Sequence, residues 1–441
     1  MSNLTRRSAI AAGVIAAATS TRGFGAGAKP AVLGGAKIRT KDWPEWPVYG
    51  KEDEEALARV LRSKLWYRST GTEVAAWEKA YAQLTGAKAC LATANGTSAL
   101  LISLSALGVG AGDEVIVPPY TFVATVNAVL SLNAIPVFVD TDRETFQIDA
   151  SKIEAAITER TVAILPVHMG GAPADLDSIL AIARKRNIPV VEDACQAHLS
   201  EWRGRKVGTY GVAGCFSFQA SKNLNSGEGG AVISNDAGLI EKCYAFHNNS
   251  RGRQASGYSS AYSLRGLNLR MTEFQGALLA AQMARLEAQS KVRRDNAAYL
   301  TSVLSAIPGI VPAKLNSGCT ANSWHLYMFR YQPEKFSGLS RAKFLQALDA
   351  EGIPASTGYA PRLNKEPFLL NAMHSRGYQR FFKPEQIAHW EKNNQCPVND
   401  LLCNEAVWFF QNMLLTDHAS MDQIAEAIRR IQASAGEIAK A

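Results

Sequence analysis

Seven short apolar runs alternate with helical patterns in the first half of the chain. These runs are nearly continuous in Val, Ile, Ala and Leu, and they span residues 88–94, 113–118, 135–140, 161–168, 188–193, 215–218 and 230–234. Continuous runs of this kind are typical of strands that are buried on both faces of a sheet. Because helical patterns separate the strands, the chain is predicted to form an open α/β layer with helices on both faces. Ligands of such layers bind beyond the carboxyl ends of the strands.

Longer segments repeat their apolar residues at the spacing of a helix. These segments cover residues 72–84, 176–186 and 273–305. Each one places its apolar residues along one side, as a helix that packs on a core does. A loop is predicted at 312–323, and a mixed pattern of shorter strands and helices follows it. The chain is therefore predicted to form a large domain at 29–290 and a small C-terminal α+β domain at 291–441.

Composition and charge argue against several classes of function. The chain has 441 residues, of which 47% are hydrophobic and 20% are charged, which is ordinary for a globular protein. The formal charge is +8, but the basic residues are scattered, whereas nucleic-acid binding favours a basic cluster. No two of the cysteines form a C-x-x-C pair, so neither a zinc site nor a thioredoxin-like site is expected. After the N-terminal leader, no apolar stretch is long enough for a membrane span.

The N-terminus has the pattern of an export signal. Arg6 and Arg7 precede an alanine-rich run, and Ala26-Gly27-Ala28 forms an A-x-A cleavage pattern. This order predicts a twin-arginine signal over residues 1–28 and a periplasmic mature protein. A basic N-terminal extension or an uncleaved anchor is the alternative, and the protein would then be cytoplasmic or membrane-attached.

Two motifs at strand ends have the chemistry of a binding site. In Asn95-Gly96-Thr97-Ser98 a strand ends and a helix begins, and the free N–H groups of a helix start favour an anion such as phosphate. Plain capping of that helix by Thr97 or Ser98 is the alternative. Asp193 ends another apolar strand, where a carboxylate could hold a protonated ring nitrogen or merely cap a helix.

Aromatic residues and a lysine complete this set. Pro118 and Pro119 end a strand before Tyr120 and Phe122, either of which could stack on a flat ring or pack in the core. Lys222 stands between an apolar strand and a glycine-rich turn, an unusual place for a lysine. A partly desolvated lysine has a free amine and can act as a nucleophile. A phosphate site, an aromatic plate, a carboxylate and a lysine are the groups that pyridoxal phosphate requires.

The same motifs, in this order, resemble the StrS-type (DegT-like) sugar aminotransferases, a family of fold-type I pyridoxal-phosphate enzymes. The resemblance covers residues 40–430 and is carried by N-G-T-S-A-L, P-Y-T-F-V-A-T, P-V-H-M-G-G, V-E-D-A-C-Q-A, F-S-F-Q-A-S-K-N-L-N-S-G-E-G-G and L-N-L-R-M-T-E-F-Q. W-P-E-W-P near residue 43 and F-R-Y-Q-P-E-K-F-S-G-L at 329 resemble a narrower branch. That branch holds keto-cyclitol aminotransferases of the 2-deoxy-scyllo-inosose type and 3-amino-5-hydroxybenzoate synthases. The family resemblance implies a mostly parallel seven-stranded sheet in the large domain and a homodimer with shared active sites.

The resemblance also implies roles for individual residues. Lys222 would be the Schiff-base lysine and proton shuttle, and Asp193 would pair with the pyridine nitrogen of the cofactor. His325 and Tyr120 would face the substrate. The other cofactor contacts would come from Gly96, Thr97, Ser98, Phe122, Gln196 and Ser217, and from Asn268 and Arg270, whose segment reaches across to the other subunit's site. No metal is expected.

The implied function is transfer of an amino group from glutamine or glutamate to a keto-cyclitol or keto-sugar. One alternative is a dehydratase or aromatising synthase of the same family, and another is a non-catalytic, sensory protein that binds pyridoxal phosphate. Deoxygenating relatives have histidine at the position of Lys222, which counts against a dehydratase. Two departures from the family pattern are Val212, where aspartate is frequent, and the leader, which cytoplasmic members lack.

Overall fold

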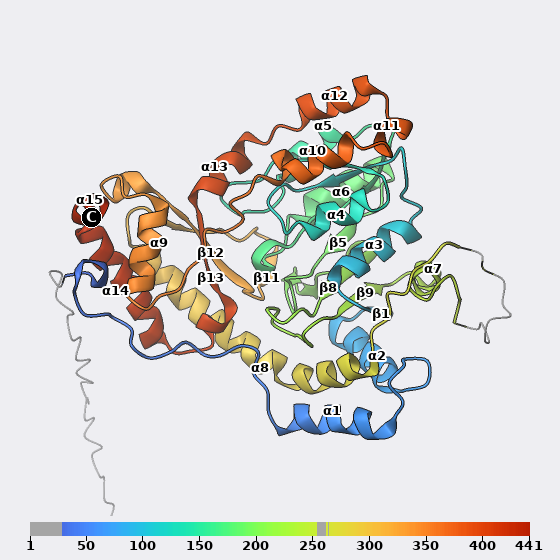
Figure 1. Ribbon diagram of the computed structural model, residues 1–441, viewed down its shortest axis with the longest axis horizontal. Helices are drawn as coiled ribbons and strands as arrows, with labels where there is room; N and C mark the ends of the chain where they lie inside the picture. The colour runs from blue at the N-terminus through green and yellow to red at the C-terminus, as the bar shows by residue number, and fades with distance from the viewer. Residues whose placement is uncertain (1–28, 254–261, 263) are drawn as a thin grey trace, which may run out of the picture.

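The computed structural model describes residues 29–441 except 254–261 and 263. The predicted export signal at 1–28 lies outside the described residues. Figure 1 shows a layered body that holds most of the helices, and a smaller group of elements around the C-terminus. None of the helices in the described part of the chain is both long and apolar enough to cross a membrane.

All seven predicted strands form one sheet. They are β1 (Ala89–Thr93), β2 (Glu114–Val117), β3 (Ile135–Phe138), β4 (Thr161–Ile164), β5 (Val191–Asp193), β8 (Ala213–Ser217) and β9 (Gly230–Ser234). Two regular sections, β3-β2-β4 and β5-β8-β9-β1, are joined by parallel bridges from Ile164 to Val190 and from Val167 to Asp193. Of these seven strands, β9 alone runs opposite to the rest, and its pairs with β1 and β8 are antiparallel. The prediction of a mostly parallel seven-stranded sheet is thus confirmed.

Helices cover both faces of the sheet because the strands bury side chains on both. Leu91 of β1 packs in the core beneath α3 (Gly96–Ala106), α4 (Ala124–Leu130) and α7 (Ala237–His247). Its neighbour Cys90 packs on the other face, against α2 (Glu73–Thr85) and the long helix α8 (Glu273–Leu304). On that same face α5 (Ile153–Ala156) and α6 (Leu176–Arg186) cover β2 and β4. Helix α1 (Lys51–Ser63) lies outside α8.

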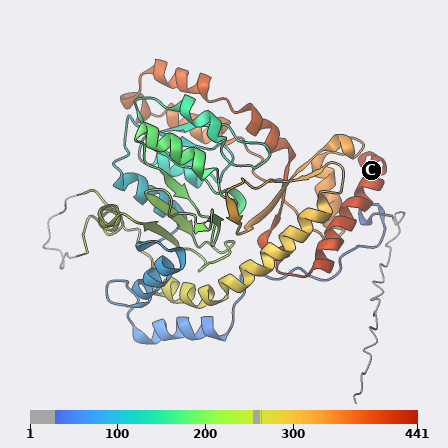
Figure 2. The same ribbon diagram turned by 180° about the vertical axis from the view of Figure 1, so that it is seen from behind.

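The small C-terminal sheet is reached through α8, which runs from the large sheet to the far group of elements (Figure 2). That sheet is antiparallel and holds β10 (Ile310–Pro312), β12 (Leu326–Tyr331) and β13 (Ala406–Phe410). Helices α9 (Arg341–Ala350), α14 (His418–Ala433) and α15 (Ala435–Lys440) pack on it. The loop predicted at 312–323 contains a strand, β11 (Cys319–Ala321), which pairs with β6 (Glu201–Trp202) of the β6–β7 (Arg205–Lys206) hairpin.

A C-terminal segment returns to the large sheet. It contains α10 (Pro367–Met373), α11 (Tyr378–Phe381), α12 (Pro384–Asn393) and α13 (Pro397–Glu405). The Tyr378 hydroxyl donates a hydrogen bond to the Ala134 carbonyl at 2.8 Å, and Trp390 Nε1 donates to Pro136 at 2.8 Å. Residues in the predicted small domain therefore share the large core, and the boundary after residue 290 stays a prediction.

Candidate active site

A cleft of about 580 Å³ lies between the large sheet and the small one. It opens where β5 and β8 end and where α3 begins, as expected for an α/β layer. Eight residues that the sequence predicted for the site line this cleft, namely Gly96, Thr97, Phe122, Asp193, Gln196, Ser217, Lys222 and His325. Ser98, Tyr120, Asn268 and Arg270 do not line it.

Lys222 lies in the tight loop that connects β8 to β9. The Ala220 amide donates to the Gly227 carbonyl at 2.8 Å, and Gly227 has a φ of 81°, which favours glycine. The Lys222 side chain is half-buried, and burial lowers the pKa of its amine. Among the described residues, none accepts a hydrogen bond from Nζ. The loop thus holds an amine without an ion partner at the cleft.

Asp193 is buried at the end of β5, and both of its carboxylate oxygens accept hydrogen bonds. The Thr125 hydroxyl donates to Oδ2 at 2.8 Å, and the Cys195 amide donates to Oδ1 at 3.2 Å. The chain passes from Asp193 through a turn to β6 without a helix, so the helix-cap alternative is wrong. The carboxylate is held at the cleft wall, where it can face a cationic ring nitrogen.

The start of α3 forms a cradle beside Lys222. Asn95, rather than Thr97 or Ser98, caps this helix, because its Oδ1 accepts from the Ser98 amide at 2.8 Å. A side-chain carbon at Gly96 would lie 2.7 Å from Ser217 Cβ, so only glycine fits there. The start of α3 and Ser217 therefore lie against each other in the wall of the cleft. A helix start and a hydroxyl suit a phosphate group.

Phe122 and Tyr120 differ in their surroundings. The Phe122 side chain is 54% exposed and lies along the cleft, where a flat ring could stack on it. Tyr120 is buried behind the cleft wall, and its ring meets the ring of Tyr359 edge to face at 5.6 Å between centroids. Core packing thus accounts for Tyr120, and the structure does not bring it into the site.

Arg270 and Asn268 lie outside the cleft of their own chain. Arg270 Nη1 donates to Asn248 Oδ1 at 3.1 Å, and its guanidinium lies 5.2 Å from the ring centroid of Tyr67. Asn268 forms a bridge with Asn248. Their predicted role across a subunit boundary stays a prediction.

The cleft also contains residues that the sequence did not point to. Tyr359, from the loop after α9, accepts a hydrogen bond from Gln196 Nε2 at 3.2 Å. Trp408 and Phe410 of β13 line the same wall, and Thr125 orients Asp193. Thr125 is the last residue of the P-Y-T-F-V-A-T motif. No local motif marks Tyr359, Trp408 or Phe410, because they reach the site only through the packing of the two sheets.

Three buried histidines near the large sheet remain neutral. Burial lowers the pKa of His198 and of His247 to about 3. The pKa of His325 is lowered as well, first by burial and then by the charge of Lys222. His325 Nδ1 lies 3.2 Å from Asn223 Oδ1 in the cleft wall. His325 therefore faces the site as an uncharged ring.

We expect the free energy of unfolding to fall as the pH drops from 6.5 towards 3. In that range the unfolded chain protonates His198, whose ordinary pKa is 6.5, but the folded chain does not until about 3. The unfolded state binds more protons, so acid favours it. Urea unfolding at a series of pH values should show a shallower fall for His198→Gln. The same substitution at exposed His389 is the control, and equal slopes in all three proteins would contradict the assignment.

The chain is similar to known proteins over most of its length. A model of the family described as "DegT/DnrJ/EryC1/StrS aminotransferase family" matches residues 47–424. The L-glutamine:2-deoxy-scyllo-inosose aminotransferase of Streptomyces lividus is 40% identical over 419 residues, covering 91% of this chain and 97% of that protein. The enzyme of the same name from Streptoalloteichus tenebrarius is 36% identical over 427 residues, covering 92% and 98%. The crystal structure of 3-amino-5-hydroxybenzoic acid synthase matches with a TM-score of 0.79 and 33% identity, covering 90% of this chain and 100% of that one.

Proposed function

Because the chain belongs to the DegT/DnrJ/EryC1/StrS aminotransferase family and is a pyridoxal-phosphate-dependent aminotransferase of fold type I, we propose that it aminates a keto-cyclitol. Glutamine, or else glutamate, is the proposed amino donor. The names of similar enzymes support both assignments. The structural observation that carries the proposal is the charge of the cleft.

Few charged groups line the cleft. Among the described lining residues Lys222 is the only lysine or arginine, and the carboxylates are Asp193 and Glu228. A sugar bound to a nucleoside diphosphate carries negative charge that needs cationic partners. An uncharged ring with several hydroxyl groups needs only polar groups and a flat apolar wall. Gln219 and Tyr359 offer the polar groups, and Trp408 and Phe410 offer the wall.

The residues of the chain fit the cofactor and its chemistry. The start of α3 and Ser217 would hold the phosphate, Phe122 would pack on the ring, and Asp193 would keep the ring nitrogen protonated. When bound, pyridoxal phosphate withdraws electrons from the carbon that carries the amino group. Lys222, whose pKa burial lowers, is the amine at the cleft that would remove the α-proton of the donor and return a proton to the product carbon.

The proposal is tested by offering the purified protein a panel of amino acids with keto-cyclitols and nucleotide-linked keto-sugars. Mass spectrometry should detect an aminated cyclitol and the oxo acid of glutamine or glutamate, with the Lys222→Ala protein as the blank. Turnover only with nucleotide-linked keto-sugars would contradict the proposal that the acceptor is a keto-cyclitol. Loss of water without amination would indicate the dehydratase or aromatising alternative, and binding without any turnover would indicate a sensory protein.

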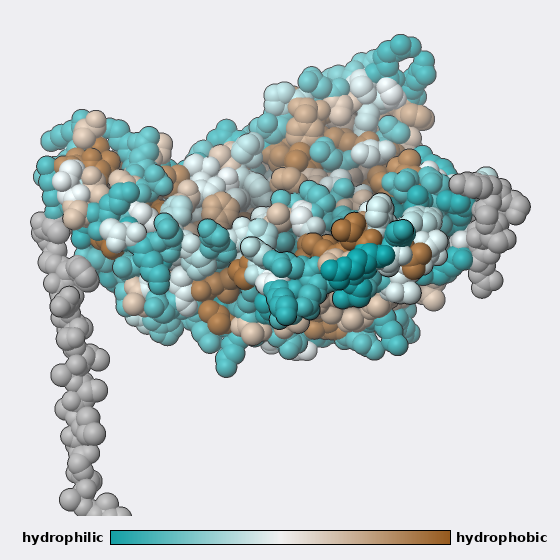
Figure 3. Space-filling model, turned by 60° about the horizontal axis from the view of Figure 1, so that its bottom comes forward, coloured by the Kyte–Doolittle hydropathy of each residue, from teal (hydrophilic) through white to brown (hydrophobic). Residues whose placement is uncertain are grey.

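We further propose that two chains form a homodimer. Apolar side chains lie exposed among charged ones on the face that includes α1 (Figure 3). Two aromatic side chains are exposed near α1. Trp66 is 49% exposed, and its Nε1 donates to the Leu61 carbonyl of α1 at 3.3 Å. Tyr67 is 41% exposed and lies beside Arg270. Exposed aromatic clusters of this kind mark interfaces. The donor's carboxylate also needs a cation other than Lys222, and the partner subunit's Arg270 would supply it.

Mixed dimers provide a direct measurement of site sharing. Lys222→Ala and Arg270→Ala chains should each be inactive, because each lacks one group of every site. Co-expressed with different tags, they should form hybrids that regain activity, because one of the two sites in each hybrid then has both groups. A hybrid shown to form but inactive would place Arg270 outside the shared site.

Export by the twin-arginine route is a separate proposal. It is supported by Arg6 and Arg7, by the alanine-rich run and by the A-x-A pattern at Ala26 to Ala28. The mature chain would begin at Lys29 in the periplasm. N-terminal sequencing of protein from periplasmic and cytoplasmic fractions tests this, and an intact Met1 or Ser2 in the cytoplasm would favour the cytoplasmic alternative.

A further inference from the structure

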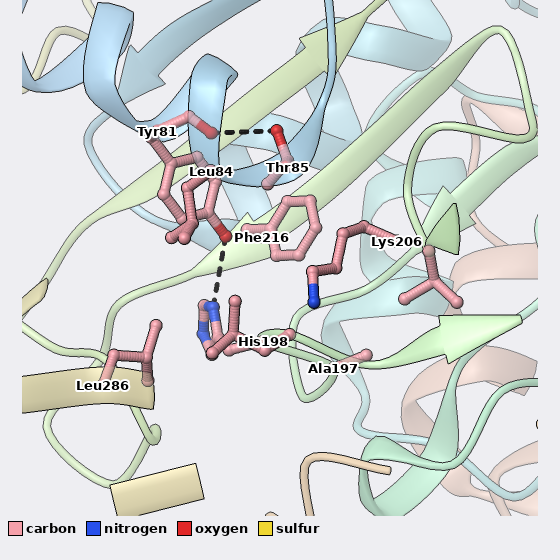
Figure 4. A pocket seen from close by; sticks show the side chains of 10 residues that line it. Tyr81, Leu84, Thr85, Ala197, His198, Lys206, Phe216 and Leu286 are labelled. Atoms are coloured by element: carbon pink, nitrogen blue, oxygen red, sulfur yellow. Dashed lines mark hydrogen bonds between the residues drawn. The ribbon is translucent and has the colours of Figure 1, made fainter. Parts of the chain in front are cut away.

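Tyr81 and His198 form a buried pair next to the strand that leads to Lys222. Tyr81 belongs to α2 and His198 to the turn after β5, and both side chains are about 1% exposed. Figure 4 shows the Tyr81 hydroxyl pointing at the His198 ring. The hydroxyl lies 3.2 Å from His198 Nδ1, and His198 Nε2 lies 2.9 Å from the carbonyl oxygen of Ser217.

These contacts permit only one arrangement of protons. A backbone carbonyl only accepts, so His198 Nε2 must carry the proton and donate to Ser217. The neutral ring then has a lone pair on Nδ1, which accepts from the Tyr81 hydroxyl. Burial raises the pKa of Tyr81 well above its usual range and lowers that of His198, so neither ionises near neutral pH. The Tyr81 hydroxyl therefore donates to His198, and His198 donates to the Ser217 carbonyl.

The Ser217–Phe218 peptide is held at both of its polar atoms. Its carbonyl accepts from His198, and its N–H, which belongs to Phe218, donates to the Gly229 carbonyl at 2.7 Å. This peptide is where β8 passes into the loop of Lys222. Ser217, at one end of the peptide, lies against Gly96 and lines the cleft, and Lys222 lies a few residues beyond the other end. Rotation of this one peptide would move both groups.

Aromatic rings enclose the pair. The His198 ring stacks on Phe218 with 5.3 Å between centroids, and the Tyr81 ring meets Phe216 edge to face at 5.5 Å. Trp77 stacks on the other side of Tyr81 at 4.9 Å. Water has little access to compete for these hydrogen bonds, so they hold a fixed geometry.

We propose that Tyr81 and His198 are positioning residues. They fix the Ser217–Phe218 peptide and thereby hold the Ser217 hydroxyl and the Lys222 amine at the positions from which both contact the cofactor. The inference rests on the proposed cofactor site. Neither side chain touches the cleft, so both act through the peptide.

The test compares cofactor affinity with stability in the holoenzyme. His198→Leu removes the donor to Ser217, whereas His198→Gln keeps an amide N–H that can reach the same carbonyl. Tyr81→Phe removes a single hydroxyl. Tyr378→Phe is the matched control, because its buried hydroxyl also donates to a carbonyl, but far from the cleft. Each protein is dialysed against falling concentrations of pyridoxal phosphate, bound cofactor is followed by its absorption, and the melting temperature is measured in parallel.

We expect the dissociation constant of pyridoxal phosphate to rise about tenfold in His198→Leu and several-fold in Tyr81→Phe, as expected for the loss of one buried hydrogen bond. His198→Gln should stay within about threefold of wild type. Tyr378→Phe should lower the melting temperature without changing affinity. Unchanged affinity in both His198→Leu and Tyr81→Phe, or an equal loss in Tyr378→Phe, would show that the pair only supports the fold. If His198→Leu does not fold, the proposal is tested by comparing the dissociation constants of pyridoxal phosphate in Tyr81→Phe and Tyr378→Phe. A wild-type protein that does not bind the cofactor at Lys222 would instead overturn the proposed site.

Discussion

Lys222→Ala should lower turnover by roughly 10²–10⁴-fold, the usual contribution of a positioned proton-transfer group. The loss is expected because Lys222 is the only lysine or arginine among the described residues that line the cleft, and burial lowers the pKa of its amine. The fold should be unaffected, since no described residue depends on Nζ for a hydrogen bond. Steady-state rates and melting curves measure the two effects separately.

A covalent label supports the assignment of Lys222 independently of turnover. Borohydride treatment of the wild-type holoenzyme should fix the cofactor on the peptide that contains Lys222, and Lys222→Ala should remain unlabelled. Lys206→Ala is the matched control, because that half-buried lysine pairs with Glu201 on the neighbouring hairpin. Labelling of another lysine in the wild-type protein would show that the assignment of Lys222 is wrong.

Asp193→Asn should retain the fold and lose most of its activity. An amide replaces the carboxylate at the same volume, but it cannot balance the charge of a protonated ring nitrogen. Hydrogen bonds to charged groups contribute about 1.5–3 kcal/mol, which corresponds to roughly a tenfold to hundredfold loss in rate. Single-turnover rates with the donor amino acid report this step directly.

Thr125→Val is the companion variant for Asp193. It keeps the carboxylate but removes the hydroxyl that donates to Oδ2. The expected loss of transition-state stabilisation is smaller, about 1 kcal/mol, because the carboxylate keeps its charge and is only held less firmly in its orientation. Wild-type turnover in Asp193→Asn, or a larger loss in Thr125→Val than in Asp193→Asn, would mean that the carboxylate acts only in packing.

Local patterns were sufficient for the large sheet and for most of the cleft. The apolar runs at β1 to β5, β8 and β9 have the length and composition of buried strands, so the sequence marks them directly. Lys222, Asp193 and Gly96 were found because each stands at a strand end beside a turn signal. Capping by Thr97 or Ser98 was the alternative to a phosphate site, and the structure shows that Asn95, one position before the helix, has the capping side chain.

Features that depend on distant contacts were not predictable in this way. The β6–β7 hairpin has strands of two residues, too short to show a period, and β11 pairs with it across more than a hundred residues. Tyr359 reaches Gln196 only because the small sheet folds against the large one. Tyr120 was expected to face the substrate because of the motif that contains it. Its burial behind Tyr359 depends on how the two sheets pack, which the motif does not show.

The return of α11 and α12 to the large sheet has a consequence for how the chain is made. Strand β3 is the last strand on its side of the sheet. The carbonyl of Pro136 in β3 accepts a hydrogen bond from Trp390, and that of Ala134, just before the strand, accepts one from Tyr378. An uncovered edge strand can pair with other chains. During synthesis β3 is made long before α11 and α12, so its edge stays uncovered until Tyr378 and the residues after it have left the ribosome. A nascent or truncated chain would therefore need protection by chaperones that the finished enzyme does not need.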